Sequence, residues 1–227
     1  MNREASQESS KHGIYFDLLK AFTQRGCPLC YEVRRLSLRS LQNLFHERVN
    51  DGGVRTALRD AKGFCNWHGW MARDLPLSNT GIAIIYKDLL DREIEALSAL
   101  ETHNLGSSQS FPERKRSKGF VRQLANFLRS WVHKQSCPEC QRVSSHEYYG
   151  LKTLVESLDD ETFSEGFARS DGLCFPHLLY ALHVSHDHPN LAILIAQQRE
   201  KYESLSVELG EFDRKRDYKF AHEPMGS

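Results

Sequence analysis

Apolar residues recur three or four positions apart over most of the chain, which is the spacing of an amphipathic helix. Two matched sets show it, namely Tyr15, Leu18, Leu19 and Phe22, and Leu124, Leu128, Trp131 and Val132. The segments 81–99 and 190–208 are rich in Leu, Ala, Glu, Lys and Gln, which are good helix formers. Alternating runs of β-branched residues are absent. The pattern therefore predicts an all-α fold.

All six cysteines fall into two short motifs, and each motif occurs twice. Cys-Pro-x-Cys stands at 27–30 and 137–140, and Cys-x-x-His stands at 65–68 and 174–177. Each copy of this pattern offers three thiols and one imidazole, which is the ligand set of a closed, four-coordinate metal site.

The spacing suits coordination because the proline restricts the backbone and lets two thiolates project from one turn. Cys-x-x-His at a helix start puts both side chains on one face. We expect each repeat to form its own site across a gap of about 35 residues. The first-repeat quartet is Cys27, Cys30, Cys65 and His68, and the second-repeat quartet is Cys137, Cys140, Cys174 and His177. Three thiolates and one imidazole suit Zn²⁺, so two structural zinc ions are predicted.

Other uses of these cysteines stay open. Iron–sulfur clusters held by three cysteines and one histidine would make the protein a redox or gas sensor. A redox dithiol of the thioredoxin kind needs a βαβ pattern, which the sequence lacks. Disulfides are disfavoured in a cytoplasmic protein.

The two copies keep a nearly constant offset. It is 110 residues between the Cys-Pro-x-Cys motifs and 109 between the Cys-x-x-His motifs, and Gly63 matches Gly172 in the same register. We interpret this as a tandem duplication of a unit of about 90 to 100 residues. The predicted organisation is a disordered N-terminal tail 1–13, a first helical metal-binding unit 14–102, a linker 103–118, a second unit 119–210 and a C-terminal tail 211–227.

Composition narrows the function further. The 227 residues include 30 basic and 30 acidic ones, so net charge does not favour nucleic acid or an anionic membrane. A sequence pI near 7.2 mildly favours self-association, so a homo-oligomer is possible. The N-terminal residues lack a signal-peptide core, and no apolar run approaches the roughly 20 residues that span a bilayer. We therefore expect a cytoplasmic protein with no membrane contact.

Three further features have ordinary interpretations. Trp67, Trp70, Phe175 and Tyr180 are expected to pack around the metal sites and exclude water. The histidines His183, His186 and His188 are expected in a solvated loop. Basic residues follow the first Cys-Pro-x-Cys motif and recur at 114–118; those after the motif are Arg34, Arg35, Arg39, Arg48, Arg55 and Arg59. They suggest a nucleic-acid-associated regulator as an alternative, although a solvated helix face explains them better.

No phosphate-binding loop, nucleophile elbow or paired carboxylate motif is present, so no enzyme is predicted. The arrangement of CPxC followed by GxCxxH, at 63–68 and 172–177, resembles a family of uncharacterised bacterial proteins with two such helical halves. The resemblance extends from Tyr15 to Leu209 and implies a bacterial cytosolic protein, but it adds no catalytic residues. The leading hypothesis is a zinc-stabilised interaction or regulatory module that binds a protein partner.

Overall fold

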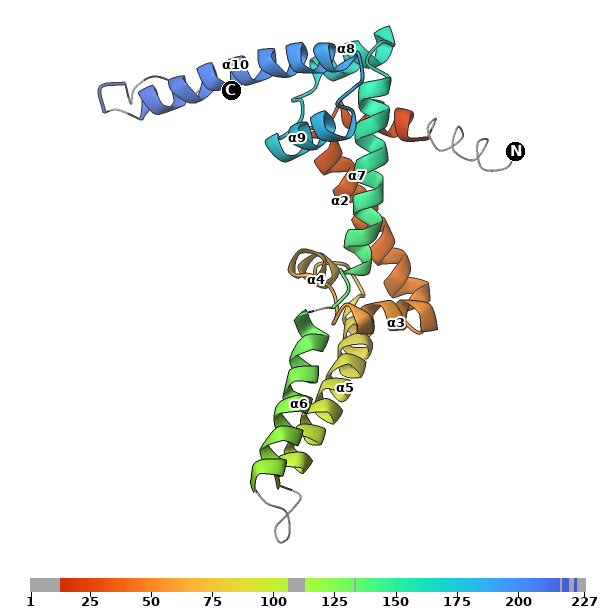
Figure 1. Cartoon of the computed structure of the whole chain (residues 1–227). Helices are drawn as coiled ribbons and strands as arrows, with labels where there is room; N and C mark the ends of the chain where they lie inside the picture. The colour runs from red at the N-terminus through yellow and green to blue at the C-terminus, as the bar shows by residue number, and fades with distance from the viewer. Residues whose placement is uncertain (1–12, 106–112, 133, 217, 221–222, 224–227) are drawn as a thin grey trace. The chain divides into compact units, whose positions relative to one another are not determined.

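The computed structural model describes residues 13–105, 113–132, 134–216, 218–220 and 223 (Figure 1). Within these residues all regular secondary structure is helical, and no strand occurs. The prediction of an all-α fold is confirmed.

The first part of the chain forms helices of very different lengths. A helix covers 13–21, and it is followed by α2 (Pro28–Asn43), the π-helical turn η1 (Leu44–Arg48), α3 (Gly52–Asp60), α4 (Asn66–Arg73) and α5 (Asn79–Leu105). The rest contains α6 (Glu113–Val132), α7 (Pro138–Glu156), α8 (Glu161–Arg169), α9 (Phe175–Val184) and α10 (Leu191–Lys215).

The short helices α3 and α8 were not predicted. Each begins with an aspartate cap: Asp51 Oδ1 accepts the N–H of Val54 at 2.8 Å, and Asp160 Oδ1 accepts the N–H of Phe163 at 2.9 Å. Such caps satisfy amide groups that have no partner inside the helix. The two aspartates are 109 positions apart, so the cap recurs in the register of the repeat.

The predicted linker 103–118 is helical at both of its edges, because α5 continues to Leu105 and α6 begins at Glu113. The charged residues at the start of α6 are good helix formers. Residues 106–112 and the greater part of the predicted N-terminal tail, 1–12, lie outside the described residues. At the other end, α10 extends to Lys215, past the predicted boundary at 210.

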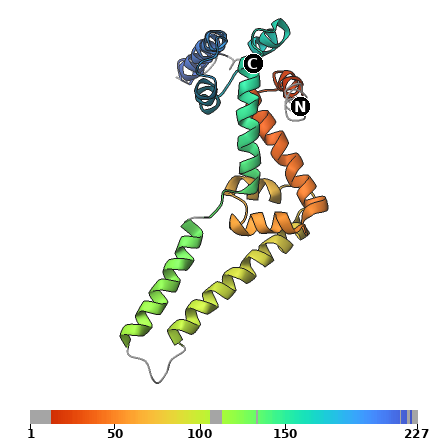
Figure 2. The same ribbon diagram turned by 45° about the vertical axis from the view of Figure 1, so that its right-hand side comes forward.

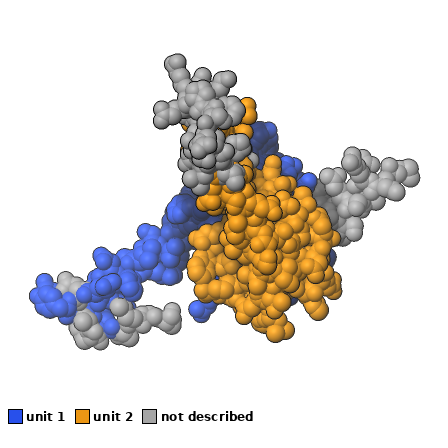
Figure 3. Space-filling model, turned by 90° about the horizontal axis from the view of Figure 1, so that it is seen from below, with its two compact units in different colours: residues 1–34, 145–227 blue, residues 35–144 orange. Residues whose placement is uncertain are grey.

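The chain divides into two compact units, drawn in blue and orange in Figure 3. Unit 1 comprises Met1–Arg34 and Ser145–Ser227, and unit 2 comprises Arg35–Ser144. Both boundaries fall inside helices, so α2 and α7 each contribute residues to both units. The compact units therefore follow a different division of the chain from the two sequence repeats.

Unit 1 has one hydrophobic core, built by the helix 13–21, the start of α2, the end of α7, and α8 to α10. Phe163 and Phe167 of α8 are fully buried, and the ring of Phe22 meets that of Phe163 edge-on at 4.9 Å. Each such side chain contributes roughly 1.5–3 kcal/mol through burial. The core holds Leu29, next to Cys30, against the side chains around Leu151 and Leu173.

Unit 2 has two smaller hydrophobic clusters, one around Leu58 and Ile85 and one around Leu41. A partly buried ion pair lies beside the first cluster, in which Arg59 donates two hydrogen bonds to Asp88, each 2.7 Å long. Arg55 lies 3.2 Å from the same carboxylate. Helices α5 and α6 contact each other, and Figure 2 shows that they approach most closely at the end where α5 finishes and α6 begins.

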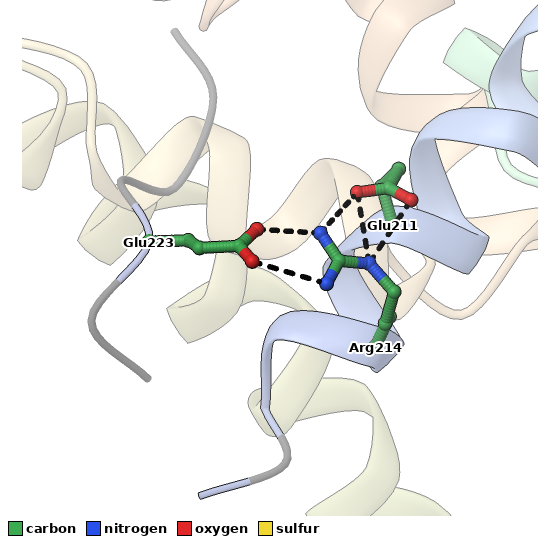
Figure 4. Close-up of polar contacts among 3 residues, drawn as sticks. All are labelled: Glu211, Arg214 and Glu223. Carbon is green, nitrogen blue, oxygen red and sulfur yellow. Dashed lines mark hydrogen bonds and ion pairs between the residues drawn. The ribbon is translucent and has the colours of Figure 1, made fainter. Parts of the chain in front are cut away.

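The C-terminal end of α10 is tied to the last described residue. Arg214 donates hydrogen bonds to both Glu211 and Glu223 (Figure 4). Contacts with Glu223 and Glu211 raise the pKa of Arg214 above its already high value. A cation at this end also interacts favourably with the helix dipole. Part of the predicted tail 211–227 is thus ordered helix with a side-chain contact beyond it.

Among the described helices, none is both long enough and apolar enough to cross a bilayer.

Candidate metal centres

The structure brings the eight predicted ligands together in two groups. Centre 1, in unit 1, consists of Cys27, Cys30, Cys174 and His177. Centre 2, in unit 2, consists of Cys65, His68, Cys137 and Cys140. Within each group, one ligand atom from every residue lies within 4.8 Å of the other three. Each group could therefore hold a metal ion.

The predicted pairing within each repeat is wrong. Each Cys-Pro-x-Cys motif faces the Cys-x-x-His motif of the other repeat, so the two predicted quartets have exchanged halves. Cys27 and His177 are 150 positions apart. A loop of that length costs only about 1 kcal/mol more to close than one of 35 residues, because the entropy cost grows with the logarithm of length. Packing of Leu29 into the core of unit 1 outweighs that difference.

All four motifs stand at helix N-termini. Cys27 precedes Pro28, the first residue of α2, and Cys137 precedes Pro138, the first residue of α7. Proline is favoured there because its missing N–H would have no partner. The N-caps of α4 and α9 are likewise ligand cysteines. Each centre thus lies at the positive ends of two helix dipoles, which favour thiolates.

The glycine of each GxCxxH motif is required by the backbone. Gly63 has φ +101° and Gly172 has φ +77°, which are left-handed conformations that side chains rarely tolerate. A Cβ at Gly172 would also lie 2.5 Å from Cδ of Lys201 and 2.8 Å from Oε1 of Gln198. A Cβ at Gly63 would be less crowded, because its nearest neighbour would be Leu89 Cδ1 at 3.3 Å.

The turn that precedes Cys174 is held by a buried amide. The N–H of Leu173 donates to Gln198 Oε1 at 2.8 Å, and Gln198 Nε2 donates back to the Leu173 carbonyl at 3.1 Å. The Tyr202 hydroxyl donates to the same carbonyl at 3.1 Å. In unit 2 the position 109 residues before Gln198 is Leu89, which packs on the apolar core instead.

The ligand atoms of centre 1 surround His177 Nδ1. The Sγ atoms of Cys174, Cys27 and Cys30 lie 3.2, 3.3 and 3.4 Å from it, and the Sγ atoms of Cys30 and Cys174 are 3.7 Å apart. These sulfur separations are too long for a disulfide. A tetrahedral zinc ion would hold sulfur atoms about 3.8 Å apart and place sulfur about 3.5 Å from nitrogen. The residues of centre 1 fit such an ion.

Centre 2 has the same form around His68 Nδ1. The Sγ atoms of Cys65, Cys140 and Cys137 lie 3.2, 3.4 and 3.7 Å from it. The Sγ atoms of Cys140 and Cys65 are 3.5 Å apart. These distances also fit one tetrahedral ion.

The second nitrogen of each histidine has a partner that the sequence did not reveal. His177 Nε2 lies 3.2 Å from Oε1 of Glu147, and His68 Nε2 lies 3.2 Å from Oγ of Ser37. Such contacts orient a ligating imidazole and fix its tautomer. Ser37 follows Cys30 by seven positions and Glu147 follows Cys140 by seven, but no known motif marks either residue.

Electrostatics within the groups call for a cation. Burial raises the pKa of the Cys30 thiol, and the neighbouring Cys27 and Cys174 raise it further. Burial also opposes ionisation of Cys27, yet hydrogen bonds from His177 and from backbone amides lower its pKa to about 7. In centre 2, burial and the adjacent Cys65 raise the pKa of Cys140 to about 12. Three thiolates in one group therefore need a positive ion to offset their repulsion.

The pKa values of the two histidines are shifted in opposite directions. Burial lowers the pKa of His177, but its hydrogen bonds with Cys27 and Glu147 outweigh burial and raise the pKa to about 10. Burial lowers the pKa of His68, with a smaller opposing effect from Glu139. The contrast therefore arises first from the hydrogen bond between His177 and Cys27, and then from the contact of the same imidazole with the Glu147 carboxylate.

The predicted aromatic shield is only partly present. The ring of Trp67 packs 4.6 Å from that of His68, and Tyr180 packs on the core of unit 1. Trp70 is 54% exposed, with the Arg73 guanidinium over its ring, and Phe175 is 68% exposed. Phe175 stacks on Tyr202 at 4.8 Å. Of the four predicted aromatic residues, Trp70 and Phe175 therefore do not shield a centre by burial.

The remaining candidates lie outside the two centres. His183, His186 and His188 join no metal-binding group among the described residues. Asp88 pairs with both Arg55 and Arg59, and Asp51 lies 3.8 Å from Arg48. Three of the six arginines considered for nucleic-acid binding are thus already engaged by carboxylates.

The fold and the two sites define an all-helical protein with two separate groups of three cysteines and one histidine. The chain belongs to the family described as "Family of unknown function (DUF6062)", whose model matches residues 14–227. No curated protein matches the chain, and no solved structure matches it.

Proposed function

We propose that this protein binds two structural Zn²⁺ ions and acts as a non-enzymatic interaction or regulatory module. The observation that carries the proposal is the convergence of eight ligand atoms in two groups, each contained within 4.8 Å. Four protein ligands leave no coordination position for water or substrate, which is typical of structural zinc. Such an ion contributes on the order of 10 kcal/mol to folding in small peptides, comparable to the stability of a whole domain.

The short distances between the ligand atoms of each centre support a single ion rather than an iron–sulfur cluster. A cluster places several irons and bridging sulfides between its ligands. Ligand atoms on different irons are then farther apart than ligand atoms around one ion. The short separations in both centres, with sulfur neighbours at 3.5 and 3.7 Å, match one tetrahedral ion.

A tandem duplication explains why the two centres match. The ligand motifs, the capping residues Asp51 and Asp160, and the histidine partners Ser37 and Glu147 all recur at 109 or 110 positions. We propose that two copies of one unit first paired symmetrically, so that each Cys-Pro-x-Cys motif met the Cys-x-x-His motif of the other copy. Duplication then joined both copies in one chain.

A protein partner is the best match to the remaining surface. Exposed apolar side chains occur on the long helices α5 and α10, among them Leu90, Ile94, Leu205 and Leu209. Cysteines that hold metal as thiolates are typical of a reducing compartment, which supports a cytoplasmic location. Nucleic acid is a weaker candidate because the net charge is zero and three of the arginines are paired.

Elemental analysis of protein purified without oxygen tests the proposal. We expect about two zinc ions per chain, no visible colour, and loss of helical circular dichroism when a strong chelator removes the metal. Iron with sulfide and a broad visible absorbance would support the cluster alternative instead. Metal-free protein with unchanged helicity would contradict the proposal. Salt-dependent retention of DNA or RNA would point to the nucleic-acid alternative.

A further inference from the structure

Helices α2 and α7 each serve both centres. Cys30 in the first turn of α2, with Cys27 directly before the helix, is a ligand of centre 1, and two turns later Ser37 of the same helix contacts His68 of centre 2.

Helix α7 repeats the arrangement in the opposite sense. Its Cys140, with Cys137 directly before the helix, is a ligand of centre 2, and its Glu147 contacts His177 of centre 1. Each centre therefore takes two ligands from one of these helices and the partner of its histidine from the other.

We propose that Ser37 and Glu147 are positioning residues that couple the two centres, so that an ion bound at either centre raises the metal affinity of the other. This inference rests on the proposed function, because it requires metal at both groups.

The spacing of seven residues is the physical basis of the coupling. Seven residues are close to two helical turns, so Cys30 and Ser37 lie on nearly the same face of α2. A rotation of the helix about its axis moves both side chains in the same direction. An ion that grips Cys30 therefore restrains Ser37 as well, and an ion that grips Cys140 restrains Glu147 in the same way.

Packing holds α2 within each unit. Leu29 is fully buried in unit 1, and Ser37 and Leu41 are fully buried in unit 2. Close-packed interiors resist rearrangement of single side chains. Ser37 consequently follows the position of the helix instead of adjusting its contact with His68 independently.

The size of the effect follows from the role of such partners. Loss of the residue that orients a metal-binding histidine typically lowers metal affinity about 10- to 100-fold. Misplacing it, instead of removing it, should have a smaller effect, so we expect a coupling factor of about tenfold. Binding linkage requires the same factor whether it is measured at centre 1 or at centre 2.

Zinc competition against a chromophoric chelator, on the full chain, tests the proposal. Cys140→Ser disables centre 2, and the affinity of centre 1 is then compared with that in the wild type. We expect it to fall about tenfold. In the background Ser37→Ala with Glu147→Ala, disabling centre 2 should change the affinity of centre 1 less than about twofold. Ser37→Thr with Glu147→Gln keeps both hydrogen-bonding groups and should restore the coupling.

Matched substitutions of exposed residues on the same helices, Arg39→Ala and Ser144→Ala, should leave the coupling as in the wild type. The proposal is overturned if Cys140→Ser leaves centre 1 unchanged, or if the fall is equal in both backgrounds, although two structural ions would then still stand. A wild-type chain that binds no zinc would instead remove the proposed function itself.

A second measurement avoids disabled centres and any folding defect that they cause. Native mass spectrometry during partial chelation counts chains with zero, one and two ions. The one-ion form should be more populated in the Ser37→Ala, Glu147→Ala variant than in the wild type. Equal populations in the two proteins would contradict the coupling. Cobalt in place of zinc adds a spectroscopic check, because the absorption bands of the variant should report altered ligand geometry.

Discussion

Centre 1 and centre 2 have the same ligands in the same motifs, but their surroundings differ. In centre 1, Cys30 is exposed and the histidine meets a carboxylate, Glu147. In centre 2, Cys137 and His68 are buried and the histidine meets the hydroxyl of Ser37. The comparison separates two properties of a metal site. Ligand identity determines which ion is preferred, whereas surroundings determine how readily the ion exchanges.

Each centre also has one nearby carboxylate, in a different place. Glu147 contacts His177 directly. Glu139, inside the Cys-Pro-Glu-Cys motif, is buried and acts on His68 without a hydrogen bond to it. Arg142 Nε lies 3.7 Å from Oε2 of Glu139. The more accessible centre therefore has the more direct negative partner.

The largest effect is expected from removing ligands in pairs. Cys30→Ser with Cys174→Ser changes one centre twice, so the protein should keep one zinc ion. Cys30→Ser with Cys65→Ser changes both centres, so it should lose both ions and most of its helicity. Elemental analysis and circular dichroism report the two outcomes. Pairing within each repeat would give the reverse result.

The rate of metal release should distinguish the intact centres. Cys140→Ser leaves only centre 1, and Cys174→Ser leaves only centre 2. We expect centre 1 to transfer zinc to a chromophoric chelator about tenfold faster, because solvent reaches its exposed Cys30. Denatured samples of both variants provide the control, since they should release zinc at one common rate. Equal or faster release from centre 2 would refute the contrast.

A third comparison concerns the glycines before the Cys-x-x-His motifs. Gly172→Ala should lower the free energy of unfolding by about 2–3 kcal/mol and Gly63→Ala by about 1–2 kcal/mol. Both substitutions strain the backbone, but only the first also collides with Lys201 and Gln198. Urea denaturation of zinc-loaded protein measures the difference. Gly210→Ala, on an open face of α10, is the matched control and should stabilise slightly.

The smallest effect is expected from an ion pair of unit 2 that has no equivalent at the corresponding position of the other repeat. Asp88 corresponds to Gln197 in the repeat register. Arg59, and then Arg55, hold the pKa of Asp88 well below its usual range, despite the opposing effect of burial. Because the folded-state pKa is depressed, the stabilisation is fully present above the usual pKa of aspartate and is lost as the pH falls through the folded value.

Asp88→Asn should therefore cost up to about 1 kcal/mol at neutral pH, and the cost should stay constant between about pH 8 and 5. Urea denaturation of zinc-loaded protein over that range checks it. Asp74→Asn removes an exposed carboxylate paired with Arg73 and should change little. A cost that disappears on mild acidification, while zinc stays bound, would contradict the assigned pKa direction.

Local chemistry in the sequence was enough to identify the helical fold and the eight residues that gather in the structure. Their pairing was not predictable from spacing, because both arrangements connect helix N-termini and differ little in loop entropy. The buried contacts of Leu29 decide between them, and those contacts depend on the tertiary packing of unit 1.

Two other features differ in how clearly the sequence indicates them. The aspartate caps of α3 and α8 follow an ordinary rule, so Asp51 and Asp160 could have indicated both helices. Ser37 and Glu147 carry no such signal, because a serine or glutamate seven residues after a cysteine is common. Only the position of the facing histidine gives either residue its role.

The exchange of partners also sets an order of events during synthesis. Cys27 and Cys30 leave the ribosome early, yet His177, the last ligand of centre 1, is synthesised 150 positions after Cys27. At typical translation rates that interval is about ten seconds or more. Centre 2 is complete once Cys140 has emerged, so its ion can bind first. The first two thiols of the nascent chain therefore wait longest for the rest of their ligand group.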